Sequence, residues 1–531
     1  MVRNIRLTLA IIFFVCITLM FLDFTGVTHT YFSWMAKLQF LPAVLALNVG
    51  VIILLLALTL IFGRIYCSVI CPMGVFQDII AWFGKKARPK KERKMPYNYS
   101  KALSALRYTV LGVFVMAIIA GIGSFVALLA PYSSYGRIAS NLFQPIYRLG
   151  NNVLASIAEK YESYAFYDVD VWIKTLPTFI IAIVTLIIIF VLAWRNGRTY
   201  CNTICPVGTV LGFFARFSFF HVTFDAEKCK NCSMCSRNCK ASCIDYKNHT
   251  VDYSRCVTCG NCLEQCKFGA LSYKFAVPSM KTAFPKEGIT YAPAASNKNA
   301  APKAEAPKAE AKAEVADKSL RTFLTILGTG AATAVMKGQT IPEATDKKVD
   351  GGLEPIPERK PSPRATPLTP PGSLSARNMK NHCTGCQLCV SVCPNNVLRP
   401  STNLMTLMQP EMSYEMGYCR PECVKCSEVC PAGAIKPISI EDKSSIQIGH
   451  AVWIKENCIV NTDEHECGNC ARHCPTGAIE MVPMDANDPK SRKIPAINTE
   501  KCIGCGTCEN LCPARPITAI YVEGHQAHRV I

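Results

Sequence analysis

Cysteine is the residue type with the most chemistry to offer in this chain, and its spacing is regular. Thirty cysteines occur among 531 residues. Most of them stand in runs in which three closely spaced cysteines are followed, after three residues, by a fourth. Thiolates in such a run bind three corners of a [4Fe–4S] cubane, and the last cysteine of another run supplies the fourth. Zinc also binds paired Cys-x2-Cys motifs, and disulfides staple small secreted domains, but the repeated triple-then-fourth spacing favours iron–sulfur clusters.

The first two runs predict a two-cluster ferredoxin module at residues 221–275. They comprise Cys229, Cys232, Cys235 and Cys239, and then Cys256, Cys259, Cys262 and Cys266. With exchanged fourth ligands, we expect one centre at Cys229, Cys232, Cys235 and Cys266, and another at Cys256, Cys259, Cys262 and Cys239. Lys240 and Lys267 stand where proline usually follows the fourth cysteine, a departure that alters the following turn more than the ligands.

Four further runs predict a four-cluster ferredoxin module at residues 379–531. They are Cys383, Cys386, Cys389 and Cys393; Cys419, Cys423, Cys426 and Cys430; Cys458, Cys467, Cys470 and Cys474; and Cys502, Cys505, Cys508 and Cys512. Only the two inner runs have a lengthened first gap, after Cys419 and after Cys458. This symmetry favours pairing of outer run with outer run and of inner with inner. In total, 24 cysteines, which would be the iron ligands, predict six [4Fe–4S] clusters.

Six cysteines remain, and four of them form a second kind of motif. The motifs are Cys67-x3-Cys71-Pro72 and Cys201-x3-Cys205-Pro206, preceded by Gly63-Arg64 and Gly197-Arg198. Residues four apart share a face of a helix, so two such pairs can present four redox thiols to each other, enough for a metal, a cluster or a disulfide relay. Simple packing is the alternative. We interpret Cys16 as a packing residue, and Cys243 as a packing residue or a spare ligand.

Apolar stretches predict an α-helical membrane domain at residues 1–220. Four stretches are long enough to cross the bilayer as helices: 8–26, 40–62, 104–130 and 176–194. The basic loop after the second stretch and Arg195 after the fourth place these ends in the cytoplasm by the positive-inside rule. We therefore expect the first ferredoxin module in the cytoplasm, and the loops 27–39 and 131–175 outside.

The two modules are joined by a long connection. Residues 276–318 are rich in Ala, Lys, Glu and Pro, a composition typical of a flexible tether. Residues 319–337 contain a short apolar segment, and 338–378 are Pro-rich. The apolar segment is either a degenerate export signal, a fifth span or a buried helix. We expect the second module outside the cytoplasm, a position that a fifth span would give it.

The membrane stretches, the two Cys-x3-Cys-Pro motifs and the following double run resemble the membrane subunit of the quinol dehydrogenase of periplasmic nitrate reductase, within the polyferredoxin family. Residues 319–523 resemble the four-cluster companion subunit. The chain is thus similar to a fusion of the two. The resemblance implies a bacterial inner-membrane, multi-pass electron-transfer subunit of anaerobic respiration that oxidises quinol. Its partners would be the membrane quinone pool and a terminal reductase or small electron carrier.

Other sequence features bear on this expectation. No Cys-x2-Cys-His haem motif, dinucleotide fingerprint or flavin motif is present. The net charge of +19 is offset by clusters of about −2 each, so we do not expect nucleic-acid binding. Tyr132, Tyr135, Arg137 and Gln144 in the outer loop are candidates to line a quinol site. The alternatives are a copper-handling accessory of oxidase assembly, which also carries Cys-x3-Cys-Pro pairs, and a membrane redox sensor.

Overall fold

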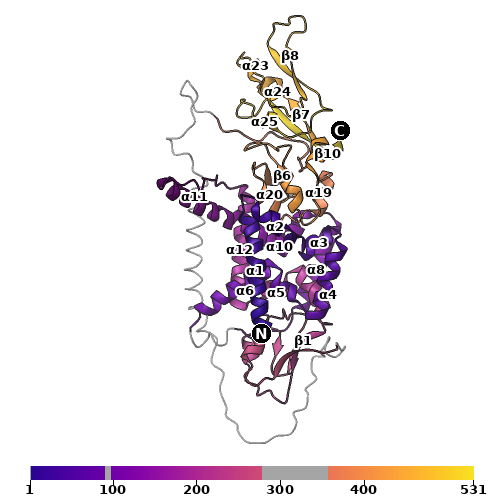
Figure 1. Cartoon of the computed structure of the whole chain (residues 1–531). Coiled ribbons are helices and arrows are strands. Elements are labelled where there is room, and N and C mark those ends of the chain that lie inside the picture. Colours follow the sequence, from indigo (N-terminus) through magenta and orange to yellow (C-terminus); the bar gives the residue numbers. More distant parts are fainter. Residues whose placement is uncertain (1, 90–96, 278–356) are drawn as a thin grey trace, which may run out of the picture. The chain divides into compact units, whose positions relative to one another are not determined.

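The computed structural model describes residues 2–89, 97–277 and 357–531 (Figure 1). Contacts divide the chain into two compact units. Unit 1 comprises the described residues of Met1–Phe14, Ile53–Leu111 and Ile187–Ile341, and unit 2 those of Val15–Ile52, Gly112–Leu186 and Pro342–Ile531. The short apolar segment 322–336, which we expect to be a signal, a span or a buried helix, lies outside the described residues.

Among the residues that the structure describes, two helices are long and apolar enough to cross a membrane. One is the segment Arg3–Leu22 of α1 (Val2–Leu22), and the other is α12 (Leu176–Asn196). Both coincide with predicted spans, which supports membrane association by length and composition only. The number of crossings remains a prediction.

The second and third apolar stretches are not continuous helices. Residues 40–62 form α3 (Phe40–Leu45) and α4 (Val49–Phe62), and the chain turns between them at Leu47, whose φ is 52°. Residues 104–130 form α8 (Ser104–Ile119) and α9 (Gly123–Leu129), with a turn at Gly121. An apolar run reports the hydropathy of a segment but not a local change of backbone direction, so the predicted single helices were wrong here.

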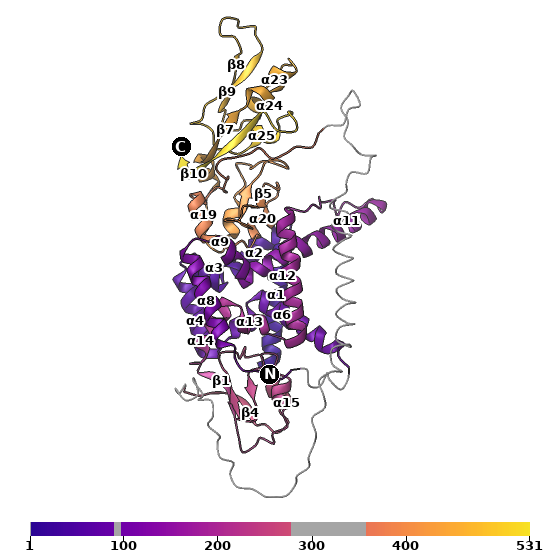
Figure 2. The same ribbon diagram turned by 180° about the vertical axis from the view of Figure 1, so that it is seen from behind.

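Unit 1 combines helices with a small α+β module. Its other elements are α5 (Ile65–Val69), α6 (Pro72–Ala87), α13 (Thr199–Thr203), α14 (Pro206–Ala215), β1 (Phe220–Phe224), α15 (Met234–Arg237), β2 (Ile244–Asp245), β3 (Thr250–Val251), α16 (Asn261–Gln265) and β4 (Leu271–Phe275). Strand β1 pairs antiparallel with β4 (Figure 2). Phe220 stands opposite Phe275 in this pair, and β2 pairs with β3.

Unit 2 contains residues 379–531, the predicted four-cluster module, and several apolar helices. Besides α3 and α9, it has α2 (Val27–Lys37), α10 (Pro131–Ile138), the π-helix η1 (Ala139–Phe143), α11 (Gln144–Lys160), α19 (Ala376–His382), α20 (Leu388–Val392), β5 (Leu398–Pro400), β6 (Pro410–Met412), α21 (Lys425–Val429), α22 (Ile440–Ser445), β7 (Ile446–Trp453), η2 (Lys455–Asn457), α23 (Ile459–Thr462), α24 (Asn469–Arg472), β8 (Ile479–Pro483), β9 (Lys493–Ile497), α25 (Thr507–Asn510) and β10 (Ile520–Val530). The antiparallel pairs are β5 with β6, β7 with β10 and β8 with β9.

One arrangement recurs three times in the two modules. Short helices pack in pairs, α15 with α16, α20 with α21 and α24 with α25. Each of these helices carries the third cysteine of its run, and the fourth cysteine follows within two residues of the helix end. Both modules therefore have the two-helix, short-strand arrangement that the cysteine spacing predicts.

Candidate metal centres

In unit 1, the first predicted set of thiols surrounds a single small cavity. Cys229, Cys232, Cys235 and Cys266 line it, together with Phe224, Phe268 and Leu271. The first three cysteines come from the loop before α15 and from α15 itself, and Cys266 follows α16. The structure thus brings together the four cysteines that the exchange of fourth ligands predicts.

The second predicted set in unit 1 also converges, and it includes a fifth thiol. Burial raises the pKa of Cys262 well above its ordinary value, and the neighbouring thiolates of Cys259, Cys256 and Cys239 raise it further. The Cys243 sulfur lies 3.5 Å from that of Cys239, and the Cys243 thiol is hydrogen-bonded to Cys256. Cys243 is therefore a direct neighbour of this set, within reach of the spare-ligand role.

In unit 2, the first helix pair assembles two sets. Cys383, Cys386, Cys389 and Cys430 line one cavity, and Cys393, Cys419, Cys423 and Cys426 line another. Helices α20 and α21 pack against each other, so the cysteine after each helix reaches the set formed by the other run.

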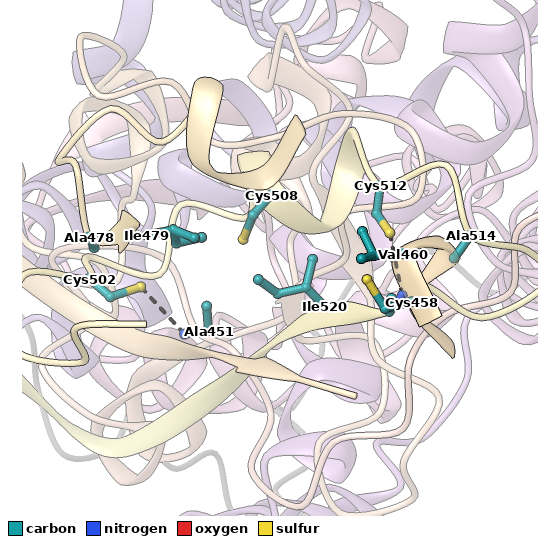
Figure 3. Close-up of a cluster of buried hydrophobic side chains, with 11 residues drawn as sticks. Ala451, Cys458, Val460, Ala478, Ile479, Cys502, Cys508, Cys512, Ala514 and Ile520 are labelled. Atoms are coloured by element: carbon teal, nitrogen blue, oxygen red, sulfur yellow. Dashed lines mark hydrogen bonds between the residues drawn. The ribbon is translucent and has the colours of Figure 1, made fainter. Parts of the chain in front are cut away.

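The second helix pair of unit 2 repeats this exchange. Cys474, Cys502, Cys505 and Cys508 line one cavity. Burial raises the pKa of Cys470 to about 11, and Cys467, Cys512 and Cys458 add to the rise, which places these thiols together. Figure 3 shows Cys458 and Cys512 on one side of Ile520 and Cys502 and Cys508 on the other, with all five side chains in one buried cluster.

The predicted pairing of outer run with outer run was therefore wrong. Adjacent runs pair instead, the first with the second and the third with the fourth. The lengthened gaps lie before the paired helices, so they do not change which helices meet. In the third run, the insertion after Cys458 forms α23 and leaves α24 free to pack on α25.

The surroundings of these thiols suit anionic sulfur. Backbone N–H groups donate to the sulfurs in both modules, for example Asn231 N to Cys229, Gly385 N to Cys383 and Ala519 N to Cys512, each at 3.4 Å. Hydrogen bonds to sulfur are a known feature of cluster sites. Burial raises the pKa of several of these thiols, for example Cys389 and Cys508, and coordination to a metal ion removes the proton. Sets of four thiols with such donors are the ligand sets that a [4Fe–4S] cluster takes.

The Cys-x3-Cys-Pro thiols are also brought together, in unit 1. Cys67, Cys71, Cys201 and Cys205 are all buried. Burial raises the pKa of Cys205 well above its ordinary value, and Cys201, Cys71 and Cys67 raise it further, so the two motifs face each other. Cys16 is a partly exposed residue of α1, in keeping with a packing role.

A charged cluster beside these thiols was not predicted. The Asp78 carboxylate accepts hydrogen bonds from Arg198 Nε at 2.6 Å and Arg6 Nη1 at 3.2 Å, and lies 2.5 Å from Lys240 Nζ. Burial would raise the pKa of Asp78, but these cations hold it well below its ordinary value. The only sequence signal was Lys240, because it replaces the usual proline after Cys239.

The four candidate quinol residues divide into two groups. Tyr132, Tyr135, Arg137 and Gln144 are all buried in unit 2. The Tyr135 hydroxyl is hydrogen-bonded to Thr18, and Arg137 donates to the carbonyl oxygens of Ala127 and Leu128. The Tyr132 hydroxyl and Gln144 Nε2 have no hydrogen-bond partner among the described residues. Tyr132 also lies near Cys386 and Cys430, whose charges act on its pKa after burial.

Comparison with known protein families agrees with the geometry. A 4Fe-4S binding domain matches residues 44–91 and 178–223, and 4Fe-4S dicluster domains match 252–397 and 465–515. No solved structure matches the chain.

Curated relatives cover a part of the chain. The methylamine utilization ferredoxin-type protein MauM of Methylobacillus flagellatus is 32% identical over 158 residues, which is 29% of this chain and 67% of the relative. MauM of Methylophilus methylotrophus is 31% identical over 29% of this chain and 70% of the relative. The ferredoxin-type protein NapG of Escherichia coli is 30% identical over 27% of this chain and 65% of the relative. The matched domains and these identities show that the chain belongs to the ferredoxin-type iron–sulfur proteins, a polyferredoxin family of electron-transfer proteins.

Proposed function

We propose that this chain is a multi-pass protein of the bacterial inner membrane that oxidises quinol and passes the electrons through six [4Fe–4S] clusters to an extracytoplasmic redox partner. The observation that carries the proposal is the contact, inside unit 2, between the four-cluster module and residues 131–175. The distribution of basic residues predicts that this segment lies outside the cytoplasm.

The contact is close and includes buried polar groups. Asn141 Nδ2 donates to Gln387 Oε1 at 2.8 Å, and the exposed fractions of the two residues are 5% and 1%. A Cβ atom at Gly136 would lie 2.4 Å from the Cys386 carbonyl oxygen, so only glycine permits this approach. The Arg399 guanidinium lies 5.0 Å from the centre of the Trp172 ring. These contacts support an outward position for the four-cluster module.

Polar groups without hydrogen-bond partners support a quinol-binding site next to the thiols of Cys383, Cys386, Cys389 and Cys430. A buried hydroxyl without a partner costs roughly 1–3 kcal/mol and needs an explanation. The Tyr132 hydroxyl and Gln144 Nε2 are two such groups in this segment, and Tyr132 is near Cys386 and Cys430. We assign to Tyr132 a hydrogen bond with a quinol oxygen. Quinol loses two electrons and two protons on oxidation, and a [4Fe–4S] cluster, when bound, would accept one electron at a time.

The remaining support comes from the number and arrangement of the thiol sets. Six sets of four cysteines are present, and adjacent sets share a helix pair. Shared helices keep neighbouring clusters a short distance apart, as an electron relay requires. The relatives named above are ferredoxin-type proteins, as their names state.

The test is reduction of the clusters by quinol. The protein is purified without oxygen, its iron and acid-labile sulfide are measured, and a short-chain quinol is added while the visible absorption of the clusters is followed. We expect quinol to bleach the cluster absorption, to a fraction of the loss of absorption that dithionite causes. Clusters that dithionite reduces and quinol leaves oxidised would contradict quinol oxidation, and zinc without sulfide would contradict the clusters themselves.

A matched pair of variants tests the quinol contact. Tyr132→Phe removes the unpaired hydroxyl and should slow quinol-driven bleaching at least tenfold, with dithionite bleaching unchanged. Tyr135→Phe removes a hydroxyl that is already bonded to Thr18, and should leave the quinol-driven rate within twofold. Equal rates in the two variants would show that Tyr132 does not contact quinol.

A further inference from the structure

A cavity of about 550 Å³ in unit 2 has no part in the thiol sets or the quinol contact described above. Its walls come from the turn after α8, from α19 and from the strand β6 with the loop before it. We call it the α8–α19 cavity, and the lining residues that matter here are Ile119, Arg377, Lys380, Asn381, Gln409 and Glu411. Its volume is in the range of cavities that bind small molecules.

One wall of the α8–α19 cavity is the exposed end of an apolar helix. Ile119 lines the cavity at the last residue of α8 and is 74% exposed, and Met116, one turn earlier, is 64% exposed. Val115 is exposed as well, and residues three and four apart lie on the same face of a helix. Contiguous exposed apolar surface marks a place where something apolar binds. The cavity therefore opens beside a surface that suits hydrocarbon chains.

The other walls of the cavity carry charges of both signs. Arg377 and Lys380 of α19 provide positive groups, and Glu411 of β6 provides a carboxyl group. In the part of the chain that the structure describes, none of these three side chains forms an ion pair. Burial raises the pKa of the Glu411 carboxyl, although Ser401 and Arg364 act in the opposite direction. The carboxylate thus lacks a full counter-charge, and so do the two cations.

Gln409 adds a buried hydrogen-bond acceptor to the same cavity. Its Nε2 atom donates to the carbonyl oxygens of Lys380 at 3.1 Å and Cys383 at 3.2 Å, which fixes the orientation of the amide. Its Oε1 atom is buried and has no hydrogen-bond partner among residues 2–89, 97–277 and 357–531. The side chain as a whole is 2% exposed. A buried acceptor without a donor is costly, so a ligand with an N–H or O–H group would stabilise it.

Close backbone contacts hold the apolar and the charged walls next to each other. A Cβ atom at Gly123, the first residue of α9, would overlap Gln409 Nε2 and lie 2.9 Å from the Lys380 carbonyl oxygen. Gly121, in the turn between α8 and α9, has a φ of 66°, and a Cβ atom there would lie 3.3 Å from Asn381 Oδ1. Glycine at both positions lets the end of α8 approach α19. The cavity is therefore formed by the fold of unit 2 itself.

These walls together select one class of ligand. A phospholipid with a primary amine has a phosphate for the cations of Arg377 and Lys380. Its ammonium group has N–H donors and a positive charge for Gln409 Oε1 and Glu411, and its acyl chains suit the exposed face of α8. A quinol head group has donors but no negative charge, and free phosphate has neither an ammonium group nor an apolar part. Basic pockets beside membrane helices are known to bind phospholipid head groups.

We propose that the α8–α19 cavity binds one phospholipid molecule whose head group carries a phosphate and a primary ammonium group, as in phosphatidylethanolamine. The ammonium group donates to Gln409 Oε1 and pairs with Glu411, and the phosphate accepts hydrogen bonds from Arg377 and Lys380. The bound lipid fastens residues 376–411 of the four-cluster module to the apolar end of α8. The inference goes beyond quinol oxidation, and of the proposed function it rests only on the membrane location.

The experiment uses the full-length protein, extracted from membranes with detergent and washed free of lipid. Phosphatidylethanolamine or phosphatidylcholine is added in mixed micelles, and native mass spectrometry counts the lipid molecules that stay bound. Phosphatidylcholine is the matched probe, because its three N-methyl groups remove the N–H donors and leave the phosphate and the acyl chains. We expect one phosphatidylethanolamine per chain, bound at least tenfold more tightly than phosphatidylcholine.

Variants locate the lipid in the cavity. Glu411→Gln keeps the size of the side chain and removes its charge, so the preference for phosphatidylethanolamine over phosphatidylcholine should fall at least fivefold. Lys380→Met should weaken the binding of both lipids, since both carry the phosphate. Glu480→Gln is the control, because Glu480 is an exposed acid of β8 outside the cavity, and it should leave both affinities unchanged. Where a variant does not fold, the comparison of the two lipids on the unaltered protein decides.

Three results would overturn the proposal. Equal affinities of the unaltered protein for the two lipids would show that the ammonium group is not recognised. An unchanged preference in Glu411→Gln would place the lipid elsewhere. A short-chain quinol that displaces the lipid one for one would assign the cavity to quinol. Recovery of the protein from the soluble fraction without detergent would refute the membrane location together with this inference, whereas a membrane protein without lipid preference refutes the inference alone.

Discussion

Asp78 Oδ1 accepts a hydrogen bond of 2.6 Å from Arg198 Nε, in the interior of unit 1. The relationship joins two parts of the chain that are 120 residues apart. Because Arg198 also donates to the Cys67 carbonyl oxygen, the acid on α6 positions the arginine that positions a thiol. Lys240, which follows Cys239, contacts the same acid. Asp78 therefore links the Cys-x3-Cys-Pro motifs to the first ferredoxin module.

The first prediction concerns this carboxylate. Asp78→Asn should lower the stability of the protein by about 3–5 kcal/mol, because it leaves three buried cations without their counter-charge. Thermal unfolding in detergent, followed by the loss of cluster absorption, measures the effect. Asp225→Asn is the control, since Asp225 pairs with Lys228 on the surface, and its midpoint should not change. Equal unfolding midpoints for the two variants would show that the Asp78 carboxylate does not stabilise the buried cations around it.

The pairing of runs in unit 2 leads to the second prediction. Cys430→Ala should disturb the centre whose other thiols are Cys383, Cys386 and Cys389. Cys393→Ala should disturb the centre of Cys419, Cys423 and Cys426. Electron paramagnetic resonance spectra of the two variants, compared with the spectrum of Cys386→Ala, identify the affected centre. We expect the spectrum of the Cys430 variant to match that of the Cys386 variant, and a match with the Cys393 variant would contradict the observed pairing.

The third prediction tests the close approach of a glycine to the first cysteine of each Cys-x3-Cys-Pro motif. Gly74→Ala or Gly208→Ala would place a Cβ atom 2.1 or 2.3 Å from a carbonyl oxygen, and each should cost about 1–3 kcal/mol through overpacking. Gly150→Ala is the control, because nothing lies within 4 Å of a Cβ atom there and alanine is the better helix former by about 1 kcal/mol. A rise of the thermal midpoint in all three variants would refute the packing argument.

Sequence spacing was sufficient for the thiol sets of the first module, because local helix geometry determines them. The third and fourth cysteines of a run sit on or just after one short helix, so the exchange between two helices follows from the spacing. The pairing of the four cysteine runs in the second module could not be predicted from the spacing within each run. Gap lengths suggested nesting, but packing of α20 on α21 and of α24 on α25 decided it, and such packing leaves no mark in the gap lengths.

Apart from Lys240 after Cys239, the buried charges left no signal in the sequence. Arg64 and Arg198 were noted only as neighbours of the motifs. Arg64 donates to the Cys201 carbonyl oxygen and Arg198 to the Cys67 carbonyl oxygen, and these hydrogen bonds depend on how the two motifs face each other. Likewise, the breaks at Leu47 and Gly121 lie within continuous apolar stretches. Hydropathy shows that a segment is apolar, while the direction of its backbone depends on tertiary contacts.

The fourth prediction concerns the pH dependence of unit 2. Burial, and then His525, lower the pKa of His528 to about 4, below its ordinary value of 6.5. The unfolded chain therefore binds a proton more readily, so the contribution of this histidine is fully present above pH 6.5 and is lost as the pH falls toward 4. The loss is on the order of 2 kcal/mol. In His528→Gln, the thermal unfolding midpoint should depend less on pH between pH 7 and 4.5 than it does in the unaltered protein. An unchanged pH dependence would contradict this role of His528.

The last prediction concerns the side of the membrane on which the four-cluster module lies. Inside unit 2 the module is bonded to Asn141 through Gln387, and the basic residues around the apolar stretches predict that the segment containing Asn141 is outside the cytoplasm. Alkaline phosphatase fused after Ile531 should therefore be active, and a fluorescent cytoplasmic reporter at the same position should be dark. The same pair of reporters fused after Phe275, at the end of the first module, is the control and should give the opposite result. A bright cytoplasmic reporter after Ile531 would mean that residues 131–175 and the four-cluster module both lie in the cytoplasm, because the buried contact between Asn141 and Gln387 cannot form across a bilayer. The electron acceptor would then have to be cytoplasmic as well.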